Sequence, residues 1–274
     1  MPAQHDRAED EAALNPRSRV ESKSRGVRAR RIIAIVAAGL GAALAVATVA
    51  FVLWATDAYS AEATAWETVQ SDQRIAVESD GNIVMMTPRL WSNGEGLIFF
   101  AGARVDPDAY AATFKNTVAA GTTVIVVRPP LNLAILETRD ASDFTGRAPD
   151  VDRWAVGGHS MGGVRACGYA QDPQIVALVL LASYCGNDDL SGRADLSVLT
   201  LSGTRDSLAT PEKIENAAST LPTDATFIQI EGVSHAQFGA YGPQDGDGTP
   251  TMDNEEARAL ISDAITEFFA GLPR

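Results

Sequence analysis

The pattern of polar and apolar positions divides the chain into distinct parts. Residues 1–31 are polar and charged, residues 32–55 carry no charged side chain, and short apolar runs alternate with amphipathic segments from about residue 73 onward. At 1.5 Å per residue, the apolar stretch would form a helix of roughly 36 Å, enough to cross a bilayer. We predict a disordered basic tail at 1–31, a transmembrane signal anchor at 32–55, a linker or juxtamembrane helix at 56–72, and a folded domain at 73–274.

The folded part alternates predicted strands with predicted helices. Short β-rich runs predict strands at 74–79, 83–88, 96–102, 122–128, 153–158, 175–183, 196–203 and 225–232. Helical spacing predicts helices at 107–121, 141–148, 160–172, 210–222 and 254–272. Strands of near-continuous Val, Ile, Leu and Ala are typical of a parallel sheet with helices on both faces, and the first two strands predict a hairpin at its edge. We therefore predict an α/β fold with a mostly parallel sheet of about eight strands.

Charge is distributed unevenly along this pattern. The chain has a net charge of −13, but its first 31 residues hold eight arginines and lysines against five acidic residues, so the remainder carries about −16. An acidic domain disfavours nucleic acid as a partner. Basic residues directly before the apolar stretch predict a cytoplasmic tail and a domain outside the cell membrane. A cleaved signal peptide is an alternative, because small residues follow the stretch, and a buried core helix is another.

The two cysteines, Cys167 and Cys185, fall in the part predicted to be exported, where disulfides are common. Cys167 is expected two turns along a helix, and Cys185 at the far end of a strand. We therefore expect two small buried thiols in preference to a bridge.

One glycine-rich stretch carries the first candidate for chemistry. In "WAVGGHSMGG", residues 154–163, a predicted strand runs into a G-x-S-x-G motif and then into a predicted helix. A serine on so tight a turn needs neighbours without a Cβ, and the turn raises its hydroxyl at the positive end of the helix. This pattern predicts Ser160 as a nucleophile. A glycine-rich turn with Ser160 as helix N-cap is the alternative.

A serine nucleophile needs a base, and the chain has three histidines. His5 lies in the tail, and the side chain of His159 should point away from that of Ser160. His235 follows the last predicted strand and is therefore the predicted base. Asp206 follows the preceding strand and is predicted to orient His235, which gives the order serine, aspartate, histidine expected for this type of fold.

Other assignments of these acidic and basic groups stay open. Asp188, Asp189 and Asp195, one strand earlier, compete for the carboxylate role. Asp206 could instead form a turn or cap, and His235 could be an exposed loop residue.

Acyl transfer also needs donors for a developing oxyanion. The backbone N–H of Met161, directly after the nucleophile, is one predicted donor. The loop "AGARVDP" would supply the other from Ala103, with Gly102 as the next choice. A plain strand-to-helix turn is the alternative for this loop.

Together these stretches resemble the α/β-hydrolase superfamily. "FFAGARVDP", "GGHSMGG", "LSGTRDSLATPEKI" and "GVSHAQFG" stand in the expected order. The chain is most similar to compact bacterial alpha/beta hydrolases related to dienelactone hydrolases, in which "GARVDP…Y", "PLNLA" and "HAQFG.YG.Q.GDG" recur. Dienelactone hydrolases proper use a cysteine nucleophile, so Ser160 makes ester hydrolysis the expected activity.

The spacing of the predicted strands bears on access to the site. About 15 residues separate Ala182 from Val198, too few for a lid domain. We expect an open site, roofed by loops at 129–137 and 240–252. Four apolar residues could line the pocket or belong to the core: Leu131, Leu133, Phe238 and Tyr241.

The chain has no zinc-type motif, P-loop or dinucleotide loop, so we expect no metal and no organic cofactor. The predicted function is a membrane-anchored serine hydrolase of small-molecule or envelope esters, with no nucleic-acid partner. An acyltransferase acting on an envelope alcohol and a non-catalytic surface binding module are the alternatives. The oligomeric state stays open.

Overall fold

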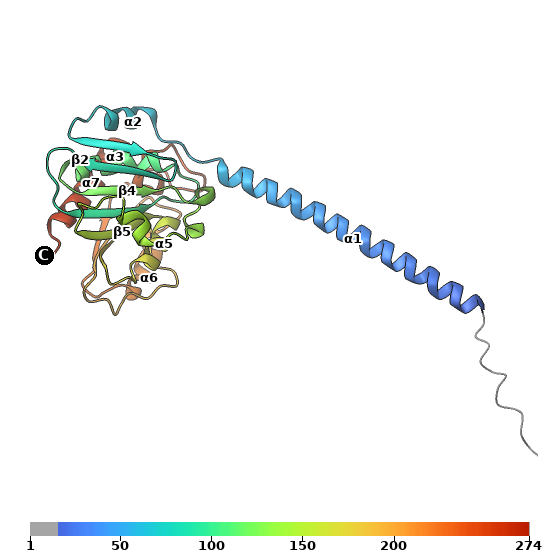
Figure 1. Ribbon diagram of the computed structural model, residues 1–274. Coiled ribbons are helices and arrows are strands. Elements are labelled where there is room, and N and C mark those ends of the chain that lie inside the picture. Colours follow the sequence, from blue (N-terminus) through green and yellow to red (C-terminus); the bar gives the residue numbers. More distant parts are fainter. Residues whose placement is uncertain (1–15, 274) are drawn as a thin grey trace, which may run out of the picture. The chain divides into compact units, whose positions relative to one another are not determined.

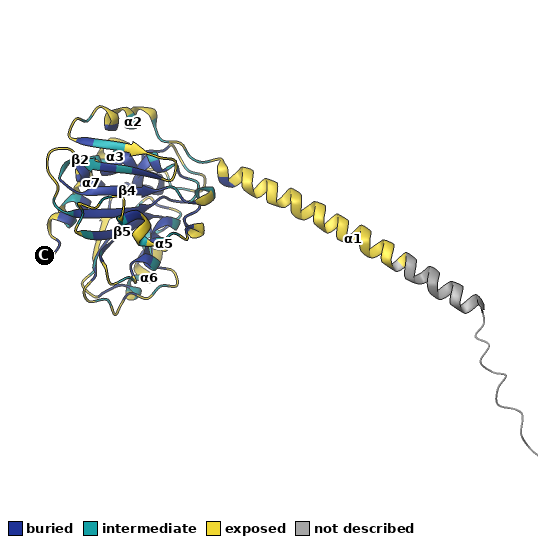
Figure 2. Ribbon diagram, in the orientation of Figure 1, coloured by how far each residue is buried: buried dark blue, intermediate teal, exposed yellow. Residues whose placement is uncertain are grey.

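The computed structural model describes residues 16–273 and divides after Trp54 into two compact units. The first consists of most of α1 (Pro16–Thr56), which is exposed along its apolar length (Figure 2). The stretch Arg30–Thr56 contains an 18-residue window with a mean hydropathy of 2.5 and is long and apolar enough to cross a membrane.

The predicted disordered tail is wrong for residues 16–31, which form the first part of α1. Once a helix exists, each further residue adds a hydrogen bond without a new nucleation step, so the apolar helix extends into the polar sequence before it. The rest of that prediction, residues 1–15, lies outside the described residues.

The second unit, from Ala55 onward, is built on one sheet of eight strands in the order β1-β2-β4-β3-β5-β6-β7-β8 (Figure 1). Only β2 runs against the others, because it pairs antiparallel with both β1 and β4. The predicted hairpin and mostly parallel sheet are confirmed. The strands are β1 (Ile75–Ser79), β2 (Ile83–Pro88), β3 (Glu95–Phe100), β4 (Thr123–Val127), β5 (Arg153–His159), β6 (Ile175–Leu181), β7 (Ser197–Gly203) and β8 (Thr226–Ile230).

Helices cover both faces of the sheet, as predicted (Figure 1). Leu97 and Phe99 of β3 face the core beneath α3 and α7, whereas Ile98 and Phe100 face the core beneath α5. Burying such side chains contributes about 1.5–3 kcal/mol each. The α-helices of this unit are α2 (Ala63–Gln70), α3 (Ala111–Ala119), α4 (Ala141–Thr145), α5 (Met161–Tyr169), α6 (Pro211–Asn216) and α7 (Asn254–Ala270). The 3₁₀ turns are η1 (Pro107–Tyr110), η2 (Pro130–Asn132), η3 (Ala134–Leu136), η4 (Ala218–Thr220) and η5 (His235–Phe238).

The strand order places the loops that follow β3 and β5. After β3 the chain moves to β4 on one side, and after β5 it moves to β6 on the other. At such a switch point the loops leave the carboxyl ends of adjacent strands in opposite directions and open a crevice between them. No helix lies between β6 and β7, so that connection forms no lid.

The segment predicted as a linker packs onto the domain. Tyr59 forms a bridge with Val105, and Ala61 forms one with Tyr241. The chain then enters α2, whose Val69 joins the core. This segment is therefore part of the folded unit.

The two cysteines form a disulfide, which corrects the expectation of two separate thiols. The loop after β6 does not end at the far edge of the sheet but runs back along α5. A Cβ on Gly163 would lie 2.3 Å from Ser183 Oγ, and one on Gly186 would lie 3.6 Å from Val164. This course brings Cys185 beside Cys167, with 5.6 Å between their Cα atoms.

Candidate active site

Ser160 lies at the sharp turn between β5 and α5. Its backbone has φ of +53° and ψ of −123°, an uncommon conformation for a residue with a side chain. The neighbouring glycines make the turn possible: a Cβ on Gly158 would lie 2.2 Å from the carbonyl carbon of Gly162, and one on Gly162 would lie 2.0 Å from the oxygen of Phe100. The side chain of Ser160 is therefore held at the carboxyl end of the sheet and is partly exposed.

His235 and Asp206 are in direct contact. His235 Nδ1 lies 2.8 Å from Asp206 Oδ2, and both side chains are buried. The other carboxylate oxygen, Oδ1, accepts the backbone N–H groups of Leu208 and Ala209 at 2.8 Å each. A carboxylate held as an acceptor makes Nδ1 the donor, so Nε2 is the nitrogen left to accept a proton.

The acceptor nitrogen of His235 is not used by another group in the described part of the chain. His235 Nε2 is buried and has no hydrogen-bond partner among the described residues. The structure gives no hydrogen bond between it and Ser160 Oγ. Nucleophile and base often come to full hydrogen-bond distance only with substrate bound.

Asp247 is a residue that the sequence prediction missed. Its two carboxylate oxygens accept the backbone N–H groups of His235, at 3.1 Å, and of Ala236, at 2.9 Å. These bonds hold the first turn of η5, which carries His235. The signal was present, because Asp247 belongs to the "GDG" of the family-like stretch.

Tyr110 is a second residue that the prediction missed, and it explains the position of His159. The hydroxyl of Tyr110 accepts the N–H of Gly102 and lies 2.9 Å from His159 Nδ1. Since the hydroxyl oxygen already accepts from Gly102, its hydrogen is free to bond Nδ1 of a neutral imidazole. Burial, together with the His235 ring 4.4 Å away, holds the pKa of His159 well below its ordinary value. His159 is therefore a neutral side chain that packs between Tyr110 and the His235 ring.

The predicted oxyanion donors come from the loop after β3 and from the start of α5. The N–H of Gly102 is engaged by Tyr110, whereas the N–H of Ala103 has no acceptor among the described residues. Arg104, with φ of +58°, donates its N–H to Asn132 O and so fixes the loop on the far side. Met161 begins α5, where N–H groups lack acceptors within the helix.

The competing carboxylates bind elsewhere, in the surface loop between β6 and β7. Asp188 accepts from Gln171, and Asp189 accepts from Ser191. Asp195 forms an ion pair with Arg193. Of the four acidic candidates, the structure brings Asp206 to His235.

Three of the four apolar residues considered for the pocket belong to the core, and one is partly exposed. Leu133, Phe238 and Tyr241 are buried. Leu131 is partly exposed and has a positive φ of 54° in the loop after β4.

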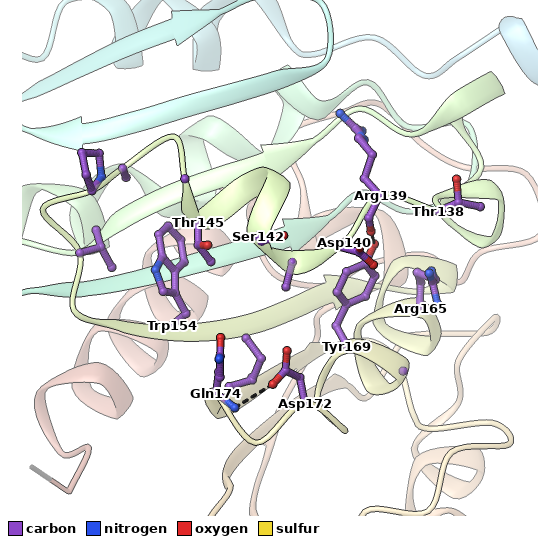
Figure 3. A pocket seen from close by; sticks show the side chains of 17 residues that line it. Thr138, Arg139, Asp140, Ser142, Thr145, Trp154, Arg165, Tyr169, Asp172 and Gln174 are labelled. Carbon is purple, nitrogen blue, oxygen red and sulfur yellow. Dashed lines mark hydrogen bonds between the residues drawn. The ribbon is translucent and has the colours of Figure 1, made fainter.

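A cavity of about 680 Å³ lies away from this group of residues (Figure 3). It is lined by α4, the last turn of α5 and the start of β5. Trp154 lies near the start of β5, at the end opposite to Ser160, and neither Asp206 nor His235 lines the cavity. The cavity is therefore separate from the candidate active site. Among the described residues, no group of three or more His, Cys, Asp or Glu side chains is placed to hold a metal ion.

A model of the alpha/beta hydrolase family matches residues 96–259, from β3 into α7. No curated protein matches the chain. An esterase from Pyrobaculum calidifontis has a TM-score of 0.52 and 14% identity, with 76% of this chain and 89% of that chain covered. The esterase domain of a Rhodothermus marinus protein has a TM-score of 0.50 and 10% identity, with 72% and 98% covered. At such identities the likeness concerns the fold alone.

Proposed function

The chain belongs to the alpha/beta hydrolase family, and from this premise we propose that it hydrolyses carboxylic esters with Ser160, His235 and Asp206. The observation that carries the proposal is the buried contact of 2.8 Å between His235 and Asp206, at the carboxyl end of the sheet where Ser160 also emerges. Asp206 holds a turn through Oδ1, but that role alone does not require Oδ2 to meet His235. His235 is fully buried, which disfavours the alternative of an exposed loop histidine.

The proposed chemistry proceeds in two halves. Ser160 Oγ attacks the ester carbonyl carbon while His235 Nε2 takes its proton, and Asp206 stabilises the imidazolium. The N–H groups of Met161 and Ala103 would donate to the oxyanion. His235 then protonates the departing alcohol. In the second half His235 takes a proton from water, which attacks the acyl-enzyme carbonyl, and His235 then returns that proton to Ser160 Oγ as the acid leaves.

Two further features support ester hydrolysis. Solved structures of similar fold include proteins named as esterases. The short connection between β6 and β7 leaves the carboxyl end of the sheet without a lid domain. Such a site accepts small esters, or esters presented on a surface.

We also propose that α1 is a single membrane anchor with the hydrolase domain on the outer side of the cell membrane. The apolar stretch and the basic residues before it support this orientation. The disulfide supports it as well, because disulfides persist in oxidising compartments.

The test uses the full chain in detergent micelles. We expect hydrolysis of short-chain and medium-chain p-nitrophenyl esters by the wild type and by Ser191→Ala, an exposed-loop control. Ser160→Ala and His235→Ala should lose about 10³-fold or more in kcat while keeping the wild-type circular dichroism spectrum. A wild type that folds, hydrolyses none of these esters and does not react with a fluorophosphonate probe would refute the proposal. Adding an alcohol acceptor and identifying the products separates hydrolysis from acyl transfer.

A further inference from the structure

Exposed apolar side chains lie on η3 and on α5, the helix that follows Ser160. Ile135 is 66% exposed and Leu136 is 40% exposed, both in η3 after β4. Val164, in the first turn of α5 after the nucleophile, is 36% exposed, and η3 packs against α5. We call residues 130–136 the apolar loop. Contiguous exposed apolar side chains on a soluble surface commonly mark a site of contact with a membrane or a partner.

The first residue of the hydrolase unit, Ala55, contacts this same loop. Ala55, the first residue of the hydrolase unit and the next-to-last of α1, is buried, and its carbonyl oxygen accepts from Asn132 Nδ2 at 3.3 Å. Because the apolar stretch ends at Thr56, the point where it ends lies against the apolar loop. If α1 crosses a bilayer, this junction lies at the membrane interface, since the stretch is only slightly longer than the hydrocarbon core.

The residues after the junction are fastened to the predicted oxyanion loop. The guanidinium of Arg104 donates to the backbone oxygen of Asp57 at 2.6 Å and forms an ion pair with its carboxylate at 3.1 Å. The N–H of Tyr59 donates to the carbonyl oxygen of Arg104 at 2.6 Å. Ala103 is the neighbour of Arg104 in the chain. The junction with the anchor, the apolar loop and one predicted oxyanion donor therefore form one continuous edge of the hydrolase unit.

We propose that the apolar loop contacts the surface of the membrane that α1 crosses, and that the ester substrate is a lipid of that membrane. The inference rests on the proposed function and on α1 as the anchor. The acyl chain reaches Ser160 from the side of Ile135 and Val164, while the ester carbonyl meets the N–H groups of the oxyanion loop.

Charge argues for an apolar contact with lipid. The part of the chain after residue 31 carries about −16, so it is not attracted to an anionic membrane by its overall charge. A contact made by isoleucine, leucine and valine does not depend on attraction between charges and persists in salt. The tether supplies the proximity that electrostatic attraction supplies elsewhere.

The first test measures the position of the loop and needs no catalysis. The chain has two cysteines, both in the disulfide, so Ile135→Cys can be labelled with the fluorophore NBD without reduction. Leu90→Cys is the matched control, because Leu90 is 76% exposed and follows β2, which runs antiparallel to β4, so it lies at the opposite end of the strands from the loop after β4. In the full chain reconstituted into phosphatidylcholine vesicles, we expect NBD at position 135 to emit at shorter wavelength and to be quenched by acyl-chain spin labels. NBD at position 90 should show neither effect.

Two results of this test would overturn the proposal. NBD at 135 that is as accessible to iodide as NBD at 90 would mean that the loop stays in water. NBD at 135 that is shielded from iodide but insensitive to lipid spin labels would mean that a second copy of the chain covers the loop.

The second test measures the substrate class. In the same vesicles, the rate on a diacylglycerol held in the bilayer is divided by the rate on p-nitrophenyl butyrate. We expect Ile135→Ser to lower this ratio on the order of tenfold, since an isoleucine side chain no longer enters the interface, and Leu90→Ser to leave it unchanged. An equal ratio in both variants would refute the lipid substrate. A wild type that hydrolyses neither ester would refute the proposed function, whereas the fluorescence result would still decide the position of the loop.

Discussion

Reduction of the disulfide is the perturbation whose effect can be worked out most directly. Cys167 and Cys185 are 18 residues apart and join the helix of the proposed nucleophile to the loop after β6. Restricting an unfolded chain by a loop of this size removes entropy worth about 3 kcal/mol at 25 °C. Both side chains are buried, so a reduced protein keeps the same packing groups and loses only the cross-link.

The assay is thermal unfolding of the full chain in detergent micelles, with and without reductant. The hydrolase unit, Ala55–Arg274, has about 220 residues, and in a unit of this size each kcal/mol corresponds to roughly 2–4 °C in Tm. We expect reduction to lower Tm by about 6–12 °C. The double variant Cys167→Ala, Cys185→Ala should unfold at about the temperature of the reduced wild type.

Alkylation followed by mass spectrometry controls for the redox state. If both cysteines react with the alkylating agent when unreduced protein is unfolded, the bridge is absent. An unchanged Tm in a protein shown to be fully reduced would refute the reasoning that the bridge stabilises by restricting the unfolded chain.

Three further predictions test single contacts. Asp206→Asn should lower kcat by about 10⁴-fold with an unchanged circular dichroism spectrum, because the amide nitrogen facing His235 would select the wrong tautomer; a smaller loss than tenfold would contradict this. Gly162→Ala should prevent stable folding, since its Cβ would lie 2.0 Å from a carbonyl oxygen of β3, whereas Gly192→Ala, with nothing within 4 Å, should match the wild type in Tm. Tyr110→Phe should lower the free energy of unfolding by about 1–3 kcal/mol in urea titration, because a buried N–H loses its acceptor; an unchanged midpoint would argue against this hydrogen bond.

A local pattern is enough to mark the candidate nucleophile, whereas the fold decides which carboxylate contacts the candidate base. The G-x-S-x-G motif marks Ser160 because steric exclusion around a tight turn acts between adjacent residues. No local pattern chooses among Asp188, Asp189, Asp195 and Asp206, since the choice depends on which loop approaches His235. The roles of these residues in catalysis stay predictions.

Tyr110 and Asp247 illustrate why the supporting residues are harder to find. Tyr110 reads as one apolar position of a helical pattern, but its hydroxyl reaches Gly102 and His159, which is 49 residues further along the chain. Asp247 reads as a turn residue, but it holds the backbone of the loop that carries His235. Such hydrogen bonds arise from the approach of separate loops, which sequence spacing does not record.

The amino-acid sequence by itself determined the alternation of strands and helices, the parallel sheet, the sharp turn at Ser160 and the single apolar stretch. These follow from hydrophobic periodicity and from steric limits on glycine-rich turns, which act over a few residues. Only the tertiary structure decided that Cys185 meets Cys167, that Asp206 meets His235, and that the segment after Ala55 packs beside the predicted oxyanion loop. Each of these depends on the course of a loop across a packed face, and that course is set by the whole core.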